Sequence, residues 1–215
     1  MQKDTLTNIT AVAADLTSLR QLLLDLFARL AYFEGDFVLS SGQPSSYYIN
    51  GKLVTLTAEG ALAVGRLLFS LLPPETLAVA GLTLGADPIV TAVSVVSAYE
   101  NHPISALIVR KEAKGHGTQA YIEGPSLPPG AKVVVLEDVV TTGKSAMLAV
   151  ERLQAVGYSV EEVIALVDRQ QGGAEFYQSQ GLKFQALFTI SEIKDFDTPT
   201  AKSATIAGDS YITAS

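Results

Sequence analysis

The sequence predicts an α/β fold in which helices cover both faces of a parallel sheet and a small N-terminal hood precedes it. Short apolar segments alternate with helix-like segments in the second part of the chain, as strand-helix-strand units require. The apolar segments lack polar alternation, which indicates strands buried on both faces. Ligand-binding loops are then expected at the carboxyl ends of the strands. The expected strands are Leu77 to Ala80, Ile104 to Val109, Val133 to Leu136, Val163 to Val167 and Phe184 to Phe188.

A helix and the hood come before these strands. Apolar residues recur at helical spacing from Leu16 to Phe33, which predicts an amphipathic helix. Gly, Ser and Pro interrupt short extended segments from Gly35 to Lys52, which indicates strands and turns outside the main sheet. Thr57 is a suitable N-cap for a helix from Ala58 to Leu72. We expect one domain over 1–215, with the helix and hood at about 16–56, the α/β core at about 57–195 and a C-terminal tail or edge element at 196–215.

Composition narrows the classes of function. The net charge is -7 over 215 residues, so no basic surface is expected for a long nucleic acid, and we expect no nucleic-acid partner. The absence of cysteine excludes disulfides and thiolate chemistry and fits a reducing compartment. No apolar run approaches the roughly 20 residues that span a bilayer, and the beginning lacks the order of a secretory signal. We therefore expect a cytoplasmic protein with no membrane partner.

The strongest chemical signal is the segment VVVLEDVVTTGKSA, from Val133 to Ala146. An apolar strand leads into two acids, Glu137 and Asp138, whose carboxylates can accept hydrogen bonds from the vicinal hydroxyls of a sugar. A turn rich in hydroxyl groups and a helix expected from Ala146 then offer amides and a helix dipole to a phosphate. One sugar phosphate would satisfy both halves of the segment.

This segment has two other interpretations. The first is a nucleotide-triphosphate P-loop ending at Gly143-Lys144-Ser145, but that motif needs Gly five positions before Gly143, where the chain has Asp138. The acids could also be solvated cap residues at an ordinary joint between a strand and a helix. Two acids followed by a hydroxyl-rich glycine turn favour the functional interpretation.

A second signal is a basic loop after the expected strand at Ile104 to Val109. The segment VRKEAKGHGTQAYIEG places four potential cations within seven residues of a net-acidic chain. A solvated basic loop is the simpler explanation for any single residue. Together with the flanking glycines, the cluster indicates a mobile lid that closes over a polyphosphate and excludes water. The cations are Arg110, Lys111, Lys114 and His116.

Two further segments offer binding groups. Arg169 lies just past an expected strand end, where its guanidinium could grip a carboxylate with two hydrogen bonds, although a surface ion pair is the alternative. In SGQPSSYYIN, from Ser41 to Asn50, the tyrosines are either core residues of the hood or part of a binding surface. In GLTLGADP, two glycines and a proline at the start of a helix suit a loop that binds diphosphate.

The segment from Val133 to Ala146 resembles the phosphoribosyl diphosphate motif of type I phosphoribosyltransferases: four apolar residues, two acids, two apolar residues and a Thr/Gly-rich turn. The basic loop is similar to the form Arg-Lys-x-x-Lys-x-His-Gly of the members that act on orotate, here ending at Gly117. The resemblance covers roughly Phe33 to Gly173. It implies transfer of the phosphoribosyl group from 5-phospho-α-D-ribose 1-diphosphate to orotate, which gives orotidine 5'-phosphate and diphosphate in pyrimidine (UMP) biosynthesis.

The resemblance also implies roles for individual residues. Lys114, His116 and Asp138 would be catalytic, and the lid would contact diphosphate in the neighbouring subunit of a homodimer. Magnesium would be the cofactor, held mainly by the diphosphate and water without a dedicated protein ligand. Orotate would meet Thr141, Arg169 and the backbone around Tyr48 and Ile49. The phosphoribosyl diphosphate site would comprise Arg110, Lys111, Lys114, His116, Glu137, Asp138, Val139, Val140, Thr141, Thr142, Gly143, Lys144 and Ser145.

The chain departs from the family pattern at three positions. Leu84 and Gly85 stand where many members carry Tyr-Lys, and Ser40 stands where many carry Lys. The side-chain contacts of those two lysines are therefore absent or replaced, and main-chain amides of the loop from Gly81 to Asp87 are expected to bind diphosphate. Two alternative functions remain at this point: a phosphoribosyltransferase for a purine base or uracil, and a regulator that senses phosphoribosyl diphosphate and binds RNA or DNA. The acidic charge and the lack of a helix-turn-helix extension speak against the regulator.

Overall fold

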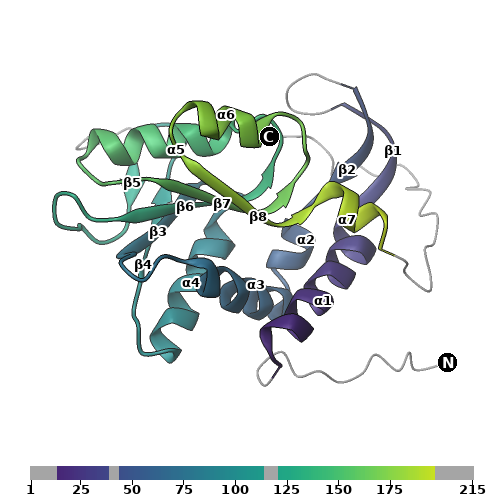
Figure 1. Cartoon of the computed structure of the whole chain (residues 1–215), viewed down its shortest axis with the longest axis horizontal. Helices are drawn as coiled ribbons and strands as arrows, with labels where there is room; N and C mark the ends of the chain where they lie inside the picture. The colour runs from purple at the N-terminus through teal and green to yellow at the C-terminus, as the bar shows by residue number, and fades with distance from the viewer. Residues whose placement is uncertain (1–13, 39–43, 114–120, 197–215) are drawn as a thin grey trace.

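The computed structural model describes residues 14–38, 44–113 and 121–196. A six-stranded sheet of order β5-β4-β3-β6-β7-β8 forms the centre of the molecule (Figure 1). Five strands are parallel, and the short β5 pairs antiparallel with β4. The strands are β3 (Ala78–Leu82), β4 (Ser105–Val109), β5 (Ile122–Glu123), β6 (Val133–Val140), β7 (Glu162–Asp168) and β8 (Lys183–Thr189). The predicted parallel core is thus confirmed, whereas β5 was not predicted.

Helices cover both faces of the sheet, as the continuous apolar strands predicted. Alternate strand residues point to opposite faces, so Val79 and Val134 pack in one core cluster while Ala80 and Val135 pack in the other. The first cluster includes residues of α1 (Leu16–Leu26), α3 (Ala58–Leu71) and α4 (Asp87–Tyr99). The second includes residues of α5 (Lys144–Ala155) and α6 (Gly173–Ser179), and Figure 1 shows the two groups of helices on opposite sides of the sheet.

The hood is a two-stranded antiparallel hairpin of β1 (Tyr32–Val38) and β2 (Pro44–Ile49). It lies beside α7 (Ile190–Lys194) at one end of the molecule (Figure 1), and α2 (Lys52–Thr55) connects it to α3. The first helix ends earlier than predicted: α1 passes into a π-helical segment, Phe27–Ala31, and stops there. The reason is that Tyr32 and Phe33 pair with Ile49 and Tyr48, which draws them into the hairpin.

Two other boundaries carry information about the site. The third expected strand extends past Leu136 to Val140, because Val139 and Val140 continue the ladder with Val167 and Asp168 of β7. The helix after Thr57 begins as predicted, since the Thr57 hydroxyl accepts a 3.0 Å hydrogen bond from the Gly60 amide. The tail beyond Phe196 lies outside the described residues.

Candidate active site at the carboxyl edge of the sheet

The strand order places a switch point between β3 and β6. From β3 the chain crosses by α4 on one face to β4, and from β6 it crosses by α5 on the other face to β7. The loops that follow β3 and β6 therefore diverge and leave a crevice at their carboxyl ends, which is where ligands bind in open α/β sheets. The predicted binding segments follow β3, β4, β6 and β7, so four strand ends bring them to one edge.

Asp138 lies in the crevice between the hood and the loop after β3. A Cβ atom built on Gly85 would lie 2.7 Å from Oδ1 of Asp138, and one built on Gly51 would lie 3.5 Å from its Cβ. The Asp138 carboxylate is half-buried and accepts a 2.8 Å hydrogen bond from the Val139 amide. It is thus held at the junction of three segments of the chain.

Glu137 has a different environment, and the expectation that both acids lie where the strand leaves the core is wrong for it. The strand continues through the acids to Val140, and Glu137 is only 7% exposed. Its Oε2 atom has no hydrogen-bond partner among the described residues. Burial raises the pKa of the Glu137 carboxyl, and the negative charge of Asp138 raises that pKa further. The buried phenol of Tyr177 is nearby, and burial followed by the charge of Glu137 raises its pKa as well.

The turn after β6 has the form of an anion cradle. Gly143 adopts φ 83° as the N-cap of α5, and a side chain there would meet the rings of Phe176 and Tyr177. The helix begins at Lys144 and not at Ala146 as predicted, because this left-handed glycine already ends the turn. The amides at the start of the helix have no partner within the helix and therefore favour an anion. The turn also carries three exposed polar side chains, those of Thr142, Lys144 and Ser145.

The basic loop is described only at its two ends. Lys114, His116 and Gly117 lie outside the described residues. Arg110 is paired with Glu123 of β5 at 3.2 Å, so its guanidinium is directed along the ladder between β4 and β5. Lys111 is exposed, and its carbonyl accepts a 2.8 Å hydrogen bond from Arg152 of α5. The same Arg152 lies 4.0 Å from the ring centre of Tyr121, so one residue of the core contacts both ends of the loop.

Arg169 is buried under the hood. The alternative interpretation, a surface ion pair, does not fit this burial. Its side chain is 6% exposed, its Nε donates to the Tyr47 hydroxyl at 3.1 Å, and its Nη2 donates to the Ser45 hydroxyl at 3.1 Å. The Arg169 amide donates to the Val140 carbonyl at 2.9 Å, which places this residue beside the strand that carries the acids. The predicted contacts Tyr48 and Ile49 belong to the same hairpin, with Tyr48 half-buried and Ile49 buried.

Sequence reasoning considered Tyr47 only as one of the tyrosines of the hood, and it did not consider Ser45. They lie two positions apart on β2 and therefore point to the same face of the hairpin. That spacing is a sequence signal, but the partner on that face, Arg169, is 122 and 124 positions away. Lys194 of α7 is a further residue that was missed, and its ammonium lies 4.1 Å from the ring centre of Tyr47.

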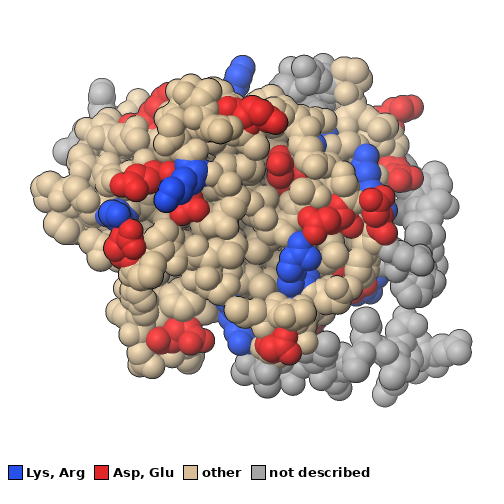
Figure 2. Space-filling view, viewed as in Figure 1, with Lys and Arg blue, Asp and Glu red and all other residues tan. Residues whose placement is uncertain are grey.

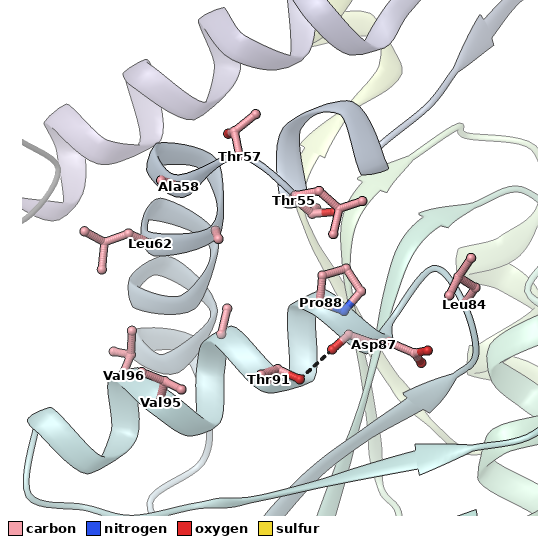
Figure 3. A pocket seen from close by; sticks show the side chains of 13 residues that line it. Thr55, Thr57, Ala58, Leu62, Leu84, Asp87, Pro88, Thr91, Val95 and Val96 are labelled. Carbon is pink, nitrogen blue, oxygen red and sulfur yellow. Dashed lines mark hydrogen bonds between the residues drawn. The ribbon is translucent and has the colours of Figure 1, made fainter.

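An open apolar groove adjoins the loop after β3. It has a volume of about 820 Å3 and is lined by residues of α2, α3 and α4 together with Leu84. Figure 3 shows Leu84 and Asp87 on the side of the groove nearest this loop, and Leu62, Val95 and Val96 on the helices. Leu84 is 65% exposed and Val95 is 53% exposed, so large apolar side chains face solvent here.

Comparison with known proteins decides the family. The chain is 76% identical over 187 residues to the orotate phosphoribosyltransferase of Nostoc sp., covering 87% of this chain and 91% of that protein. It is 73% identical over 192 residues to the orotate phosphoribosyltransferase of Synechocystis sp., covering 88% and 97%. The chain belongs to the orotate phosphoribosyltransferase family.

Solved structures support the same assignment. The orotate phosphoribosyltransferase of Mycobacterium tuberculosis H37Rv in complex with 5-phospho-alpha-D-ribosyl 1-diphosphate matches with a TM-score of 0.68 and 35% identity, over 82% of this chain and 99% of that chain. The adenine phosphoribosyltransferase of Leishmania donovani, at 16% identity and a TM-score of 0.59, shares the fold alone. No family model matches the chain. The predicted type I phosphoribosyltransferase fold and the predicted enzyme, an orotate phosphoribosyltransferase of pyrimidine biosynthesis, are confirmed.

Proposed function

We propose that the crevice binds phosphoribosyl diphosphate along the carboxyl edge of the sheet. The 5'-phosphate binds the turn from Thr141 to Ser145, where helix amides and exposed hydroxyl groups meet. The ribose hydroxyls bind Asp138, and Glu137 contributes its unpartnered carboxyl oxygen. The backbone of Val139 and Val140 lies between these two contacts. The approach of Gly85 to Asp138 supports this arrangement, because it sets the diphosphate loop beside the ribose.

Orotate lies under the hood in this proposal. Arg169 binds its carboxylate, while Thr141 and the backbone of Tyr48 and Ile49 contact the ring. The observation that carries the proposal is the 2.9 Å hydrogen bond between the Arg169 amide and the Val140 carbonyl. This bond links Val140, at the end of the strand that carries the two acids, to Arg169, the residue that would bind the base. The two substrates are thereby neighbours across adjacent strands, which is the requirement for direct transfer.

Magnesium is the cofactor we propose. The proposed ion is held mainly by diphosphate oxygens and water, because Mg2+ keeps several waters and commonly binds through substrate phosphates. When bound there, magnesium neutralises charge on the diphosphate and makes it a better leaving group.

The chain's own residues assist the reaction by position and charge. When diphosphate departs, positive charge develops on the ribose ring. The ring nitrogen of orotate attacks the anomeric carbon from the opposite face and gives up its proton, which diphosphate or water accepts. Asp138 holds the ribose during this change. Lys114 and His116 stabilise the leaving diphosphate, with Arg110 and Lys111 at the start of the same loop. No covalent intermediate with the protein is required.

Lys114 and His116 are proposed to act in the neighbouring subunit of a homodimer. The apolar groove beside Leu84 is the surface proposed for the second copy, since it joins exposed apolar side chains to the diphosphate loop. A second copy seated there would bring its lid next to the diphosphate. Acidic and basic side chains are interspersed on the face that Figure 2 shows. The described residues contain no helix long and apolar enough to cross a membrane. We place the enzyme in the cytoplasm, which its lack of cysteine fits.

The test is the near-ultraviolet absorbance of orotate after enzyme, magnesium and phosphoribosyl diphosphate are mixed. The absorbance should fall with the wild-type chain. Asp138→Asn should raise the KM for phosphoribosyl diphosphate and lower the rate with the fold intact. Arg169→Ala should raise the KM for orotate far more than that for phosphoribosyl diphosphate, because a lost carboxylate contact costs about 1.5–3 kcal/mol. Equal effects of Arg169→Ala on both substrates would remove Arg169 from the orotate site.

A further inference from the structure

One edge of the Arg169 guanidinium is already occupied by the hood. Nε donates to the Tyr47 hydroxyl at 3.1 Å and Nη2 donates to the Ser45 hydroxyl at 3.1 Å. These two nitrogens lie on the same edge of the planar group, which is one of the two edges that can bind a carboxylate with paired hydrogen bonds. Among the described residues, Nη1 has no hydrogen-bond acceptor, so the edge formed by Nη1 and Nη2 is the one left for a ligand.

The hood also fixes the plane of the guanidinium. The Arg169 carbon Cζ lies 4.5 Å from the ring centre of Tyr47, and the Tyr47 ring is itself 7% exposed. Lys194 lies 4.1 Å from the same ring centre, and the ring of Tyr32 lies 5.9 Å away. A buried ring with three neighbours has little freedom to turn, so its hydroxyl is a fixed acceptor. Arg169 therefore has one orientation before any substrate arrives.

We propose that Tyr47 and Ser45 are positioning residues that hold Arg169 by its Nε edge and present its Nη1/Nη2 edge to the carboxylate of orotate. This inference rests on the proposed role of Arg169. It assigns part of the preference for a carboxylated base to the hood, because a guanidinium held in place binds a carboxylate without losing side-chain freedom on binding. Uracil, which has the same ring without the carboxylate, gains nothing from this arrangement.

The test is Tyr47→Phe, which keeps the ring and removes only the acceptor. The KM for orotate should rise about three- to tenfold, the effect of one lost hydrogen bond. The KM for phosphoribosyl diphosphate and the inhibition constant of uracil against orotate should stay unchanged. Ser45→Ala should act in the same direction. Tyr158→Phe is the matched control, because it removes a phenol that accepts a 3.2 Å bond from the Leu127 amide away from the site.

A double-mutant cycle with Arg169→Lys separates the inference from the role on which it rests. If Tyr47 acts through Arg169, Tyr47→Phe should have no further effect on the KM for orotate in the Arg169→Lys background. If Arg169→Lys raises that KM and Tyr47→Phe does not, the positioning role is wrong and the role of Arg169 stands. If Arg169→Lys leaves that KM unchanged, both fall. A lower KM for orotate in Tyr47→Phe would mean that the hood competes with the substrate for Arg169, which also overturns the inference. Circular dichroism establishes that each variant is folded before its constants are compared.

Discussion

Gly85 leaves no room for a side chain beside Asp138: a Cβ atom there would lie 2.7 Å from Oδ1 of the carboxylate. Gly85→Ala should therefore displace the carboxylate from the ribose and raise the KM for phosphoribosyl diphosphate several-fold, with a smaller effect on the KM for orotate. Steady-state kinetics with each substrate varied would measure both constants. In an Asp138→Asn background the same substitution should change the dissociation constant of phosphoribosyl diphosphate little, because the two residues act as one unit. Full additivity would mean that Gly85 acts on the diphosphate independently of Asp138.

Glu137→Gln should change how stability depends on pH. Burial and then the charge of Asp138 raise the pKa of Glu137 in the folded protein, so the folded state binds this proton more tightly than the unfolded state. The corresponding stability is full below about pH 4 and is lost as the pH rises toward the folded pKa. Glutamine carries no charge, so the variant does not lose this stability. Above about pH 4.5 its free energy of unfolding should rise relative to that of the wild type, by up to about 1.4 kcal/mol per pH unit.

Urea denaturation of both proteins at pH 5, 6, 7 and 8 would measure this difference. Glu151→Gln is the control, because Glu151 is exposed on α5. The change with pH should be larger for Glu137→Gln than for this control. Equal pH dependence of the two variants would show that Glu137 is ionised in the folded protein.

The apolar groove beside Leu84 is the proposed contact between two copies of the chain, so a charge placed in it should change the oligomeric state. Val95→Glu places a charge among exposed apolar side chains, so it should shift the protein from dimer to monomer in light scattering and lower the activity. Val156→Glu is matched in chemistry and exposure, 56% against 53%, but lies at the end of α5 in the other layer of helices. It should leave the mass unchanged. A Val95→Glu protein that keeps a dimeric mass would place the subunit contact elsewhere.

A shared site predicts complementation between inactive chains. Lys114→Ala and Asp138→Asn should each be nearly inactive alone. If the lid acts in the partner, a mixed dimer has one site with both defects and one intact site. Random pairing of equal amounts makes half of the dimers mixed, so activity should recover to roughly 25% of wild type by two-fold symmetry. Co-expression of differently tagged chains ensures pairing, and purified mixed dimers that stay inactive would assign Lys114 to its own subunit's site.

The sequence by itself determined the layered fold and the enzyme family. Strands without polar alternation bury both of their faces, so other elements must pack on both sides of the sheet. This pattern is contained within each strand. The motif from Val133 to Ala146 and the basic loop are also contiguous in the chain, so their chemistry could be inferred without coordinates. The N-cap at Thr57 is a further local signal, and the structure has it where it was predicted.

The tertiary structure decided the relationships between distant segments. Only strand pairing shows that β6 continues to Val140 and buries Glu137, because the ladder partners lie on β7. Only packing brings Gly85 against Asp138 and sets Tyr47 and Ser45 on one edge of Arg169. A local pattern specifies which face of a strand or helix is apolar, but a hydrogen bond across more than 100 residues depends on how the whole chain folds. For that reason the reaction could be predicted from the sequence, whereas the different environments of the two acids could not.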